Sequence, residues 1–137
     1  MTFRRTRSVF VGEDDASGLI YFPTYYTYMS EAEQLMFEEL GLPMADQIRR
    51  GTAMPVVHSE CDYIAPVRAG DVLTQVVELE AGGRSTITLW HEFRDASTGQ
   101  VRARARLVRA LTSLEAMTSV PIPDDIRAQL TGHPAAG

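Results

Sequence analysis

The period of the hydrophobic pattern changes once along this chain, and that change restricts the fold more than any other feature. Over residues 24–40 large apolar side chains recur at helical spacing, with acidic and amide side chains on the opposite side. Pro23 is compatible with a first helical turn, and Gly41 followed by Pro43 ends the pattern. We therefore expect one amphipathic helix, about 25 Å long. Its apolar stripe consists of Tyr25, Tyr28, Met29, Ala32, Leu35, Met36 and Leu40.

After Gly51 the pattern has a period of two, which is typical of strands. Turn residues separate four strand-length segments, at 55–65, 72–79, 85–93 and 101–112. In the last segment alanine and leucine alternate with an arginine ladder (Arg102, Arg104, Arg106), which we expect to face outward. Residues 3–11 are expected to form a first strand and residues 124–130 a short helix. This order predicts an α+β fold in which one long helix covers one face of a five-stranded antiparallel sheet.

The length and composition suit one domain. The chain has 137 residues, of which 45% are hydrophobic, so it can bury a core without metal or disulfide staples. We expect a single domain over residues 1–137, with its core at about 3–113 and a tail at 121–137. Trp90 and Phe93 are expected to be core or packing residues, and most of the methionines are expected to lie in the core. A single helix leaves sheet edges uncovered, which favours a homodimer or a dimer of dimers.

Charge and cysteine content bear on location and partners. The net charge of −5 argues against a general nucleic-acid binder, and Cys61, the only cysteine, cannot form an intrachain disulfide. No apolar run is long enough for a signal peptide or a membrane span. These features predict a cytoplasmic protein in a reducing compartment, with no nucleic-acid or membrane partner.

The chemistry is expected where three carboxylates, Glu13, Asp14 and Asp15, precede the start of the long helix. The first N–H groups of a helix have no intrahelical acceptor and can hold a developing oxyanion. A carboxylate facing them can attack a carbonyl carbon or activate water. The alternative is that the three acids form a solvated turn cluster without chemistry.

The same segment resembles the hotdog-fold acyl-CoA thioesterases of the 4-hydroxybenzoyl-CoA thioesterase type. The resemblance lies in an Asp followed three residues later by Gly, then by aromatic residues leading into an aromatic-rich helix start. The matching positions are Asp15, Gly18, Tyr21, Phe22, Pro23 and Tyr25. Further matches lie at 41–43, 55–57, Tyr63 with Pro66, and 70–73, so that residues 8–112 are covered.

The resemblance implies that Asp15 is the catalytic carboxylate, acting as nucleophile or as general base. It also implies that the backbone N–H of Phe22 holds the thioester oxygen. Gly18 would permit a backbone conformation, or a close approach, that a Cβ would block. No metal or bound cofactor is implied, because coenzyme A is part of the substrate.

The expected acyl pocket is aromatic and is formed by Tyr21, Pro23, Tyr25 and Tyr26, with His58 and Ser59 contributed to the site of a partner subunit. Relatives that act on short aliphatic substrates carry His where Phe22 stands, which favours an aromatic or bulky apolar acyl group here. Ser30 stands where hydroxybenzoyl-specific relatives have an Asp, so a benzoyl group fits this sequence better than 4-hydroxybenzoyl.

Coenzyme A carries phosphates, and the resemblance places Arg84 and Ser85 near them. This pair ends a Gly82–Gly83 corner that is predicted to be a two-residue hairpin turn. The arginine ladder is a second candidate for phosphate binding, although such a ladder is more often a solvated strand face.

The sequence contains two other arrangements of acidic residues that bear on the site. Another hotdog branch takes its catalytic acid from the helix, but Glu31 and Glu33 point about 160° apart and are expected to be solvated or interface residues. His58, Glu60 and Asp62 share one face of a strand, yet ligands about 7 Å apart rarely converge on a metal ion, so no metal site is expected.

The sequence therefore predicts a hydrolase that cleaves an acyl-CoA thioester, with benzoyl or another bulky apolar group as the acyl part. A thioesterase acting on a carrier-protein-bound acyl chain and a non-catalytic acyl-binding module are the alternatives. A hotdog hydratase is disfavoured because no His stands at the helix start.

Overall fold

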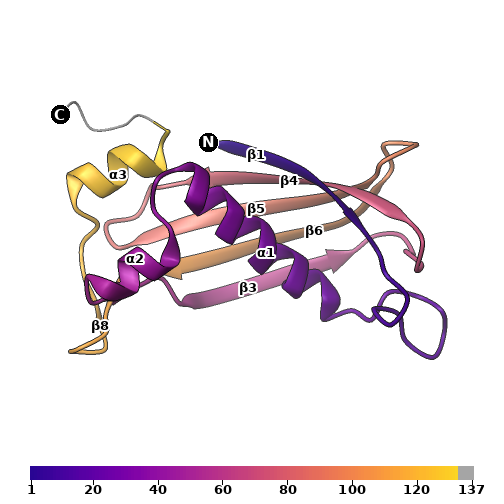
Figure 1. Cartoon of the computed structure of the whole chain (residues 1–137), viewed down its shortest axis with the longest axis horizontal. Helices are drawn as coiled ribbons and strands as arrows, with labels where there is room; N and C mark the ends of the chain where they lie inside the picture. Colours follow the sequence, from indigo (N-terminus) through magenta and orange to yellow (C-terminus); the bar gives the residue numbers. More distant parts are fainter. Residues whose placement is uncertain (133–137) are drawn as a thin grey trace.

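The long helix α1 (Thr24–Glu39) lies across one face of a five-stranded antiparallel sheet (Figure 1). A computed structural model describes residues 1–132. The strands occur in the spatial order β1-β4-β5-β6-β3, so that β1 and β3 form the two edges. Their bounds are β1 (Thr2–Ser8), β3 (Val56–Tyr63), β4 (Val72–Glu80), β5 (Thr86–Asp95) and β6 (Val101–Ala110). This is the predicted α+β hotdog arrangement of one long helix and a five-stranded sheet.

The helix and the strands form where the two hydrophobic periods predicted them. Helix α1 is followed by Gly41, whose φ of +76° allows the N–H of Leu42 to donate to the Phe37 carbonyl at 2.8 Å. On β6, Ala103 and Ala105 are buried beneath the helix. The arginine ladder alternates with them and points away from the helix, as predicted.

A second, smaller sheet was not predicted. It consists of β2 (Thr52–Ala53), β7 (Thr112–Ser113) and β8 (Thr118–Ser119), and it follows the short helix α2 (Met44–Arg49). Elements of two or six residues are too short to show a hydrophobic period, which is why the sequence pattern missed them. Helix α3 (Asp124–Leu130) forms at the predicted residues, and Arg127 donates to the Gly83 carbonyl at 2.9 Å.

Two apolar clusters fill the space between α1 and the sheet, and a row of buried polar side chains lies between them. One cluster contains Met36 and Leu89, and the other contains Met29 and Phe93. The polar row consists of Gln75, His91 and Glu33, all buried, and ends at Arg109. On β5, His91 separates Leu89 from Phe93, so the row marks the boundary between the clusters.

The hydrogen bonds of the polar row fix the direction of each donor. Arg5 Nε can only donate, so the oxygen of Gln75 faces it at 2.8 Å and the amide nitrogen faces His91 Nδ1 at 3.2 Å. His91 Nδ1 must then accept, which leaves the ring proton on Nε2, directed at Glu33 Oε2 at 3.0 Å. Arg109 Nε donates to the other Glu33 oxygen at 2.7 Å. Each Glu33 oxygen therefore has a donor.

Three predictions about burial were wrong. Glu33, expected to be solvated or at an interface, is 0% exposed, because Arg109 compensates its charge inside the protein and His91 donates a hydrogen bond to it. Leu35 is 43% exposed, because the buried face of α1 includes Glu33 and Phe37 instead. Trp90 is also 43% exposed and lies on the outer face of the sheet beside Arg106.

None of the helices in residues 1–132 is both long and apolar enough to cross a membrane.

Candidate active site

The loop that carries Asp15 is folded against the segment that leads into β4. The N–H of Ile20 donates to the Val67 carbonyl at 2.7 Å, and Leu19 forms a bridge with Arg68. Gly18 has a φ of +81°, and its N–H donates to the Asp15 carbonyl at 3.0 Å. A Cβ at Gly18 would meet no protein atom within 4 Å, whereas the positive φ is one that L side chains rarely adopt, so the backbone conformation by itself favours glycine here.

Asp15 presents an exposed carboxylate with purely local partners. Its Oδ1 accepts from the Ser17 N–H at 2.8 Å and from the Ser17 hydroxyl. These bonds from Ser17 hold the pKa of the Asp15 carboxyl below its usual value, so the group is ionised at neutral pH. Ser17 was not predicted to take part, although a Ser two residues after an Asp is a common turn pattern.

The other two acids of the loop are bound elsewhere. Glu13 accepts from Arg7, Tyr28 and the Phe10 N–H, and Asp14 accepts from the Gly12 N–H at 3.0 Å. The three acids are thus not an undifferentiated solvated cluster. Asp14 and Asp15 are each bound only within the loop, by Gly12 and Ser17, and of these two carboxylates Asp15 is the exposed one.

The start of α1 leaves one backbone donor available. Pro23 is the N-cap residue and offers no N–H, and no side chain caps the helix. The N–H groups of Tyr21 and Thr24 donate to the carbonyls of Glu13 and Tyr21, at 2.9 and 2.8 Å. The Phe22 N–H has no acceptor among residues 1–132. An unpaired N–H at this position suits an oxyanion donor.

Phe22 also lines an apolar cavity of about 300 Å³. Phe22, Tyr25 and Tyr63 contribute its aromatic walls, with ring centroids of Phe22 and Tyr25 at 6.1 and 5.6 Å from that of Tyr63. Burial raises the pKa of the Tyr25 hydroxyl, so it stays neutral. The remaining lining residues are Leu19, Ile20, Ile64, Ala65, Pro66 and Val67.

Of the predicted pocket residues, the structure brings Tyr25 to this cavity together with Phe22. Tyr21 is 52% exposed and packs edge-on against Phe22 at 5.5 Å, while Pro23 and Tyr26 lie near the helix start without lining the cavity. Tyr63 was not predicted to be a pocket residue, although it and Pro66, which also lines the cavity, were among the positions that match the family pattern. Ser30 lies farther along α1, where its hydroxyl accepts from Gln34 at 3.3 Å.

His58 and Ser59 lie on β3, the exposed edge strand. Seven of the eight β3 residues are exposed, so this edge is open to another chain. Ser59 pairs with Leu107 and shares the face that α1 covers, whereas His58 pairs with Val108 and points to the outer face. His58 Nε2 lies 3.8 Å from Glu60, and residues 1–132 contain no group of three His, Cys, Asp or Glu side chains suited to a metal ion.

Arg84 and Ser85 lie at the far end of the sheet from Asp15. The Asp15 loop adjoins the start of β4, where Val9 N–H donates to Asp71, while Arg84 follows the end of β4, about 30 Å away at strand spacing. The predicted two-residue turn is wrong, because residues 81–85 form a five-residue connection in which the Arg84 carbonyl receives the Ile122 N–H. The Arg84 side chain is exposed.

The arginine ladder offers few free cations. Arg102, Arg104 and Arg106 pair with Asp95, Glu92 and Glu60 at 3.3, 3.0 and 2.6 Å. A hollow of about 690 Å³ on this outer face is larger than the aromatic cavity, but mixed and mostly paired charges line it. It lies on the opposite side of the sheet from α1, so we assign the chemistry to the smaller cavity.

Sequence comparison identifies the family. Residues 9–130 match the model of the thioesterase-like superfamily. The chain belongs to this superfamily. It is a thioester hydrolase by class, since its relatives are thioesterases.

Individual relatives match this chain over most of its length, and the solved structures among them share its fold. A 1,4-dihydroxy-2-naphthoyl-CoA hydrolase of Synechocystis sp. is 26% identical over 123 residues, 89% of each chain. The crystal structure of a 1,4-dihydroxy-2-naphthoyl-CoA thioesterase from Synechocystis superposes with a TM-score of 0.90 at 25% identity, covering 98% of this chain and 100% of that one. A gentisyl-coenzyme A thioesterase superposes with a TM-score of 0.80 at 27% identity, covering 90% and 98%.

Proposed function

We propose that this protein hydrolyses aromatic acyl-CoA thioesters and that the acyl group enters the cavity lined by Phe22, Tyr25 and Tyr63. The observation that carries the proposal is the placement of an ionised, exposed Asp15 in the loop that precedes the unpaired Phe22 N–H and this aromatic cavity. An apolar cavity of about 300 Å³ is at the small end of the range for ligand sites, which suits a ring system better than a long chain.

The residues support two routes to the same products. In the first, an Asp15 oxygen bonds to the thioester carbonyl carbon, the C–S bond breaks, and CoA leaves as a thiolate that takes a proton. Water then cleaves the mixed anhydride, which releases the free acid and restores the carboxylate. In the second, Asp15 takes a proton from the attacking water and passes it to the leaving thiolate. In both routes the Phe22 N–H would stabilise the oxyanion.

Among aromatic acyl groups, 1,4-dihydroxy-2-naphthoyl and benzoyl are the first to test. The first is the substrate named for the Synechocystis relatives, and the second is what the aromatic helix start and Ser30 predict. The same relatives favour coenzyme A over a carrier protein as the thiol part. No metal or cofactor takes part in either route.

A second copy would complete the site. β3 and the residue after it expose the apolar side chains Val56, Val57, Tyr63 and Ile64, each at least 43% exposed, along with an unpaired strand edge. Antiparallel pairing of two β3 strands would cover these side chains and bring Ser59 of one copy toward the cavity of the other. It would also bring Arg84 and Ser85 of one copy toward the Asp15 end of the other, where the phosphates of coenzyme A could reach them. Sedimentation of the purified protein as a monomer would contradict this part of the proposal.

The experiment is a thiol-release panel on the purified chain. Benzoyl-, phenylacetyl-, 1,4-dihydroxy-2-naphthoyl-, butyryl- and palmitoyl-CoA would be compared by kcat/KM. We expect the aromatic esters to exceed both aliphatic esters by at least about tenfold. Equal turnover of all five would refute the aromatic pocket, and no turnover of any would favour a carrier-bound substrate or a binding role.

A further inference from the structure

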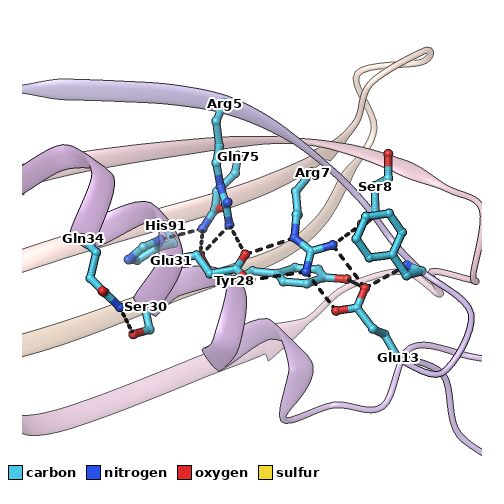
Figure 2. Close-up of polar contacts among 11 residues, drawn as sticks. Arg5, Arg7, Ser8, Glu13, Tyr28, Ser30, Glu31, Gln34, Gln75 and His91 are labelled. Carbon is cyan, nitrogen blue, oxygen red and sulfur yellow. Dashed lines mark hydrogen bonds and ion pairs between the residues drawn. The ribbon is translucent and has the colours of Figure 1, made fainter. Parts of the chain in front are cut away.

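Four polar side chains join the loop before Asp15 to the helix and to β1 (Figure 2). We refer to Arg7, Glu13, Tyr28 and Glu31 as the Arg7 cluster. Arg7 donates from both terminal nitrogens to the two Glu13 oxygens, at 3.2 and 3.0 Å, and from Nε to Glu31 at 3.0 Å. The Arg7 and Glu13 side chains are 15% and 21% exposed, so the forked pair is largely shielded from water.

Glu13 holds both halves of the proposed site. Its side chain accepts from the Tyr28 hydroxyl and the Phe10 N–H, both at 2.8 Å. Its carbonyl accepts from the Tyr21 N–H at 2.9 Å and from the Thr24 hydroxyl at 3.3 Å. One residue thus binds the segments on both sides of Phe22 and stands two positions before Asp15.

Arg7 is fixed as firmly as its partner. Its guanidinium lies over the rings of Tyr28 and Phe10, at 4.4 and 4.7 Å from their centroids. Although burial alone would lower the pKa of Arg7, Glu31 and Glu13 hold it above its usual value. Burial likewise opposes ionisation of Glu13, but the Phe10 N–H, Tyr28 and Arg7 keep its pKa below the usual value. Arg7 and Glu13 are therefore both charged at neutral pH.

Both Glu13 oxygens accept from Arg7, so the Glu13 carboxylate has no free oxygen to offer a substrate, and none of the four side chains lines the aromatic cavity. The contacts of the cluster instead set where the Asp15 loop sits relative to the helix start. We propose that Glu13, held by Arg7, is a positioning residue that fixes the Asp15 carboxylate relative to the Phe22 N–H. This inference rests on the proposed function, because it assigns Glu13 a role in that reaction.

The effect should appear in the rate of the chemical step. A misplacement of about 1 Å at a reacting group can cost about 10²-fold in rate, whereas substrate binding in the cavity needs no contact with Glu13. For Glu13→Gln we expect kcat to fall by about 10- to 100-fold, with KM within about threefold of wild type. If Arg7 acts through Glu13, the double variant Arg7→Lys/Glu13→Gln should have a kcat only slightly below that of the more impaired single variant.

The matched control is Glu38→Gln, the same chemical change at an exposed position of α1. Both variants would be compared with wild type by steady-state kinetics on the best ester of the panel and by amide hydrogen exchange. The proposal predicts faster exchange in Glu13→Gln at the loop amides of Gly18, Ile20 and Tyr21, with the sheet unchanged.

The proposal is overturned if kcat for Glu13→Gln stays within about threefold of Glu38→Gln. It is also overturned if exchange rises throughout the sheet, because Glu13 would then be a general stabilising residue. A wild-type protein that hydrolyses none of the esters refutes the proposed function and, with it, the catalytic role of Glu13. In that case, faster amide exchange in the loop of Glu13→Gln would show only that Glu13 anchors the loop.

Discussion

The carboxylates of Asp15 and Glu33 differ in their exposure and in their hydrogen-bond partners. Asp15 is exposed in a loop, and Ser17 of its own turn is its only side-chain partner. Glu33 is fully buried beneath α1, with His91 on one oxygen and Arg109 on the other. Both have a pKa below the usual value, so both are charged at neutral pH. A negative charge alone therefore does not identify the reactive carboxylate, because both oxygens of the charged Glu33 already accept hydrogen bonds and none is free for a substrate.

The largest expected effect concerns stability at Glu33. Glu33→Ala would leave Arg109 and His91 buried without their acceptor, and removal of one partner of a buried pair costs about 3–5 kcal/mol. We expect this loss in urea denaturation, whereas Glu38→Ala on the exposed side should stay within about 0.5 kcal/mol. Equal effects of the two changes would contradict a structural role for Glu33.

The next prediction distinguishes the contribution of the Phe22 backbone N–H to catalysis from that of the Phe22 side chain. Phe22→Pro removes the N–H proposed to hold the oxyanion and should lower kcat by about 10²- to 10³-fold. Phe22→Ala keeps the N–H and removes only a cavity wall, so it should raise KM while leaving kcat within a few-fold. Both are measured by thiol release, with circular dichroism as a check that α1 still forms. A kcat that falls equally in both variants would assign the role to the side chain.

Acid should weaken the Glu33 contribution to stability. Burial raises the pKa of this carboxyl, but His91 and Arg109 more than offset it, so the folded-state pKa lies below the ordinary 4.5. A depressed pKa stabilises the fold fully above about pH 4.5 and progressively less as pH falls toward the folded-state value. The stability difference between wild type and Glu33→Gln, followed by urea denaturation from pH 7 to pH 3, should therefore shrink below about pH 4.5. A constant difference over this range would contradict this linkage.

The smallest expected effect is at Arg84. If an exposed Arg84 of a second copy contacts the phosphates of coenzyme A, Arg84→Ala should raise KM by roughly two- to fivefold and leave kcat unchanged. The rise should disappear at high salt, because exposed charges are screened. Arg50→Ala, at another exposed arginine, serves as the control. An unchanged KM at low salt would remove Arg84 from the site.

The sequence predicted the parts of this molecule that depend on regular periods and on local turns. The helix at residues 24–40, the strands and the outward arginine ladder all follow from apolar spacing. Phe22 and Tyr25 could be expected near Asp15 because they follow it by only seven and ten residues in the same segment.

What could not be predicted depends on contacts between distant segments. Glu33 looks like a solvated helix acid until His91 and Arg109 are brought to it from two strands, 58 and 76 residues away. Tyr63 reaches the cavity only because β3 lies at the edge of the sheet beside β6. No local period carries such information.

Catalysis by Asp15 is tested most directly by thiol release by Asp15→Asn at saturating concentration of the best aromatic ester. We expect a kcat at least about 10²-fold below wild type, because loss of a nucleophile or general base typically costs this much. We also expect an unchanged melting temperature, since the Asp15 carboxylate has no partner outside its own turn. A kcat within about threefold of wild type would show that another group performs the reaction.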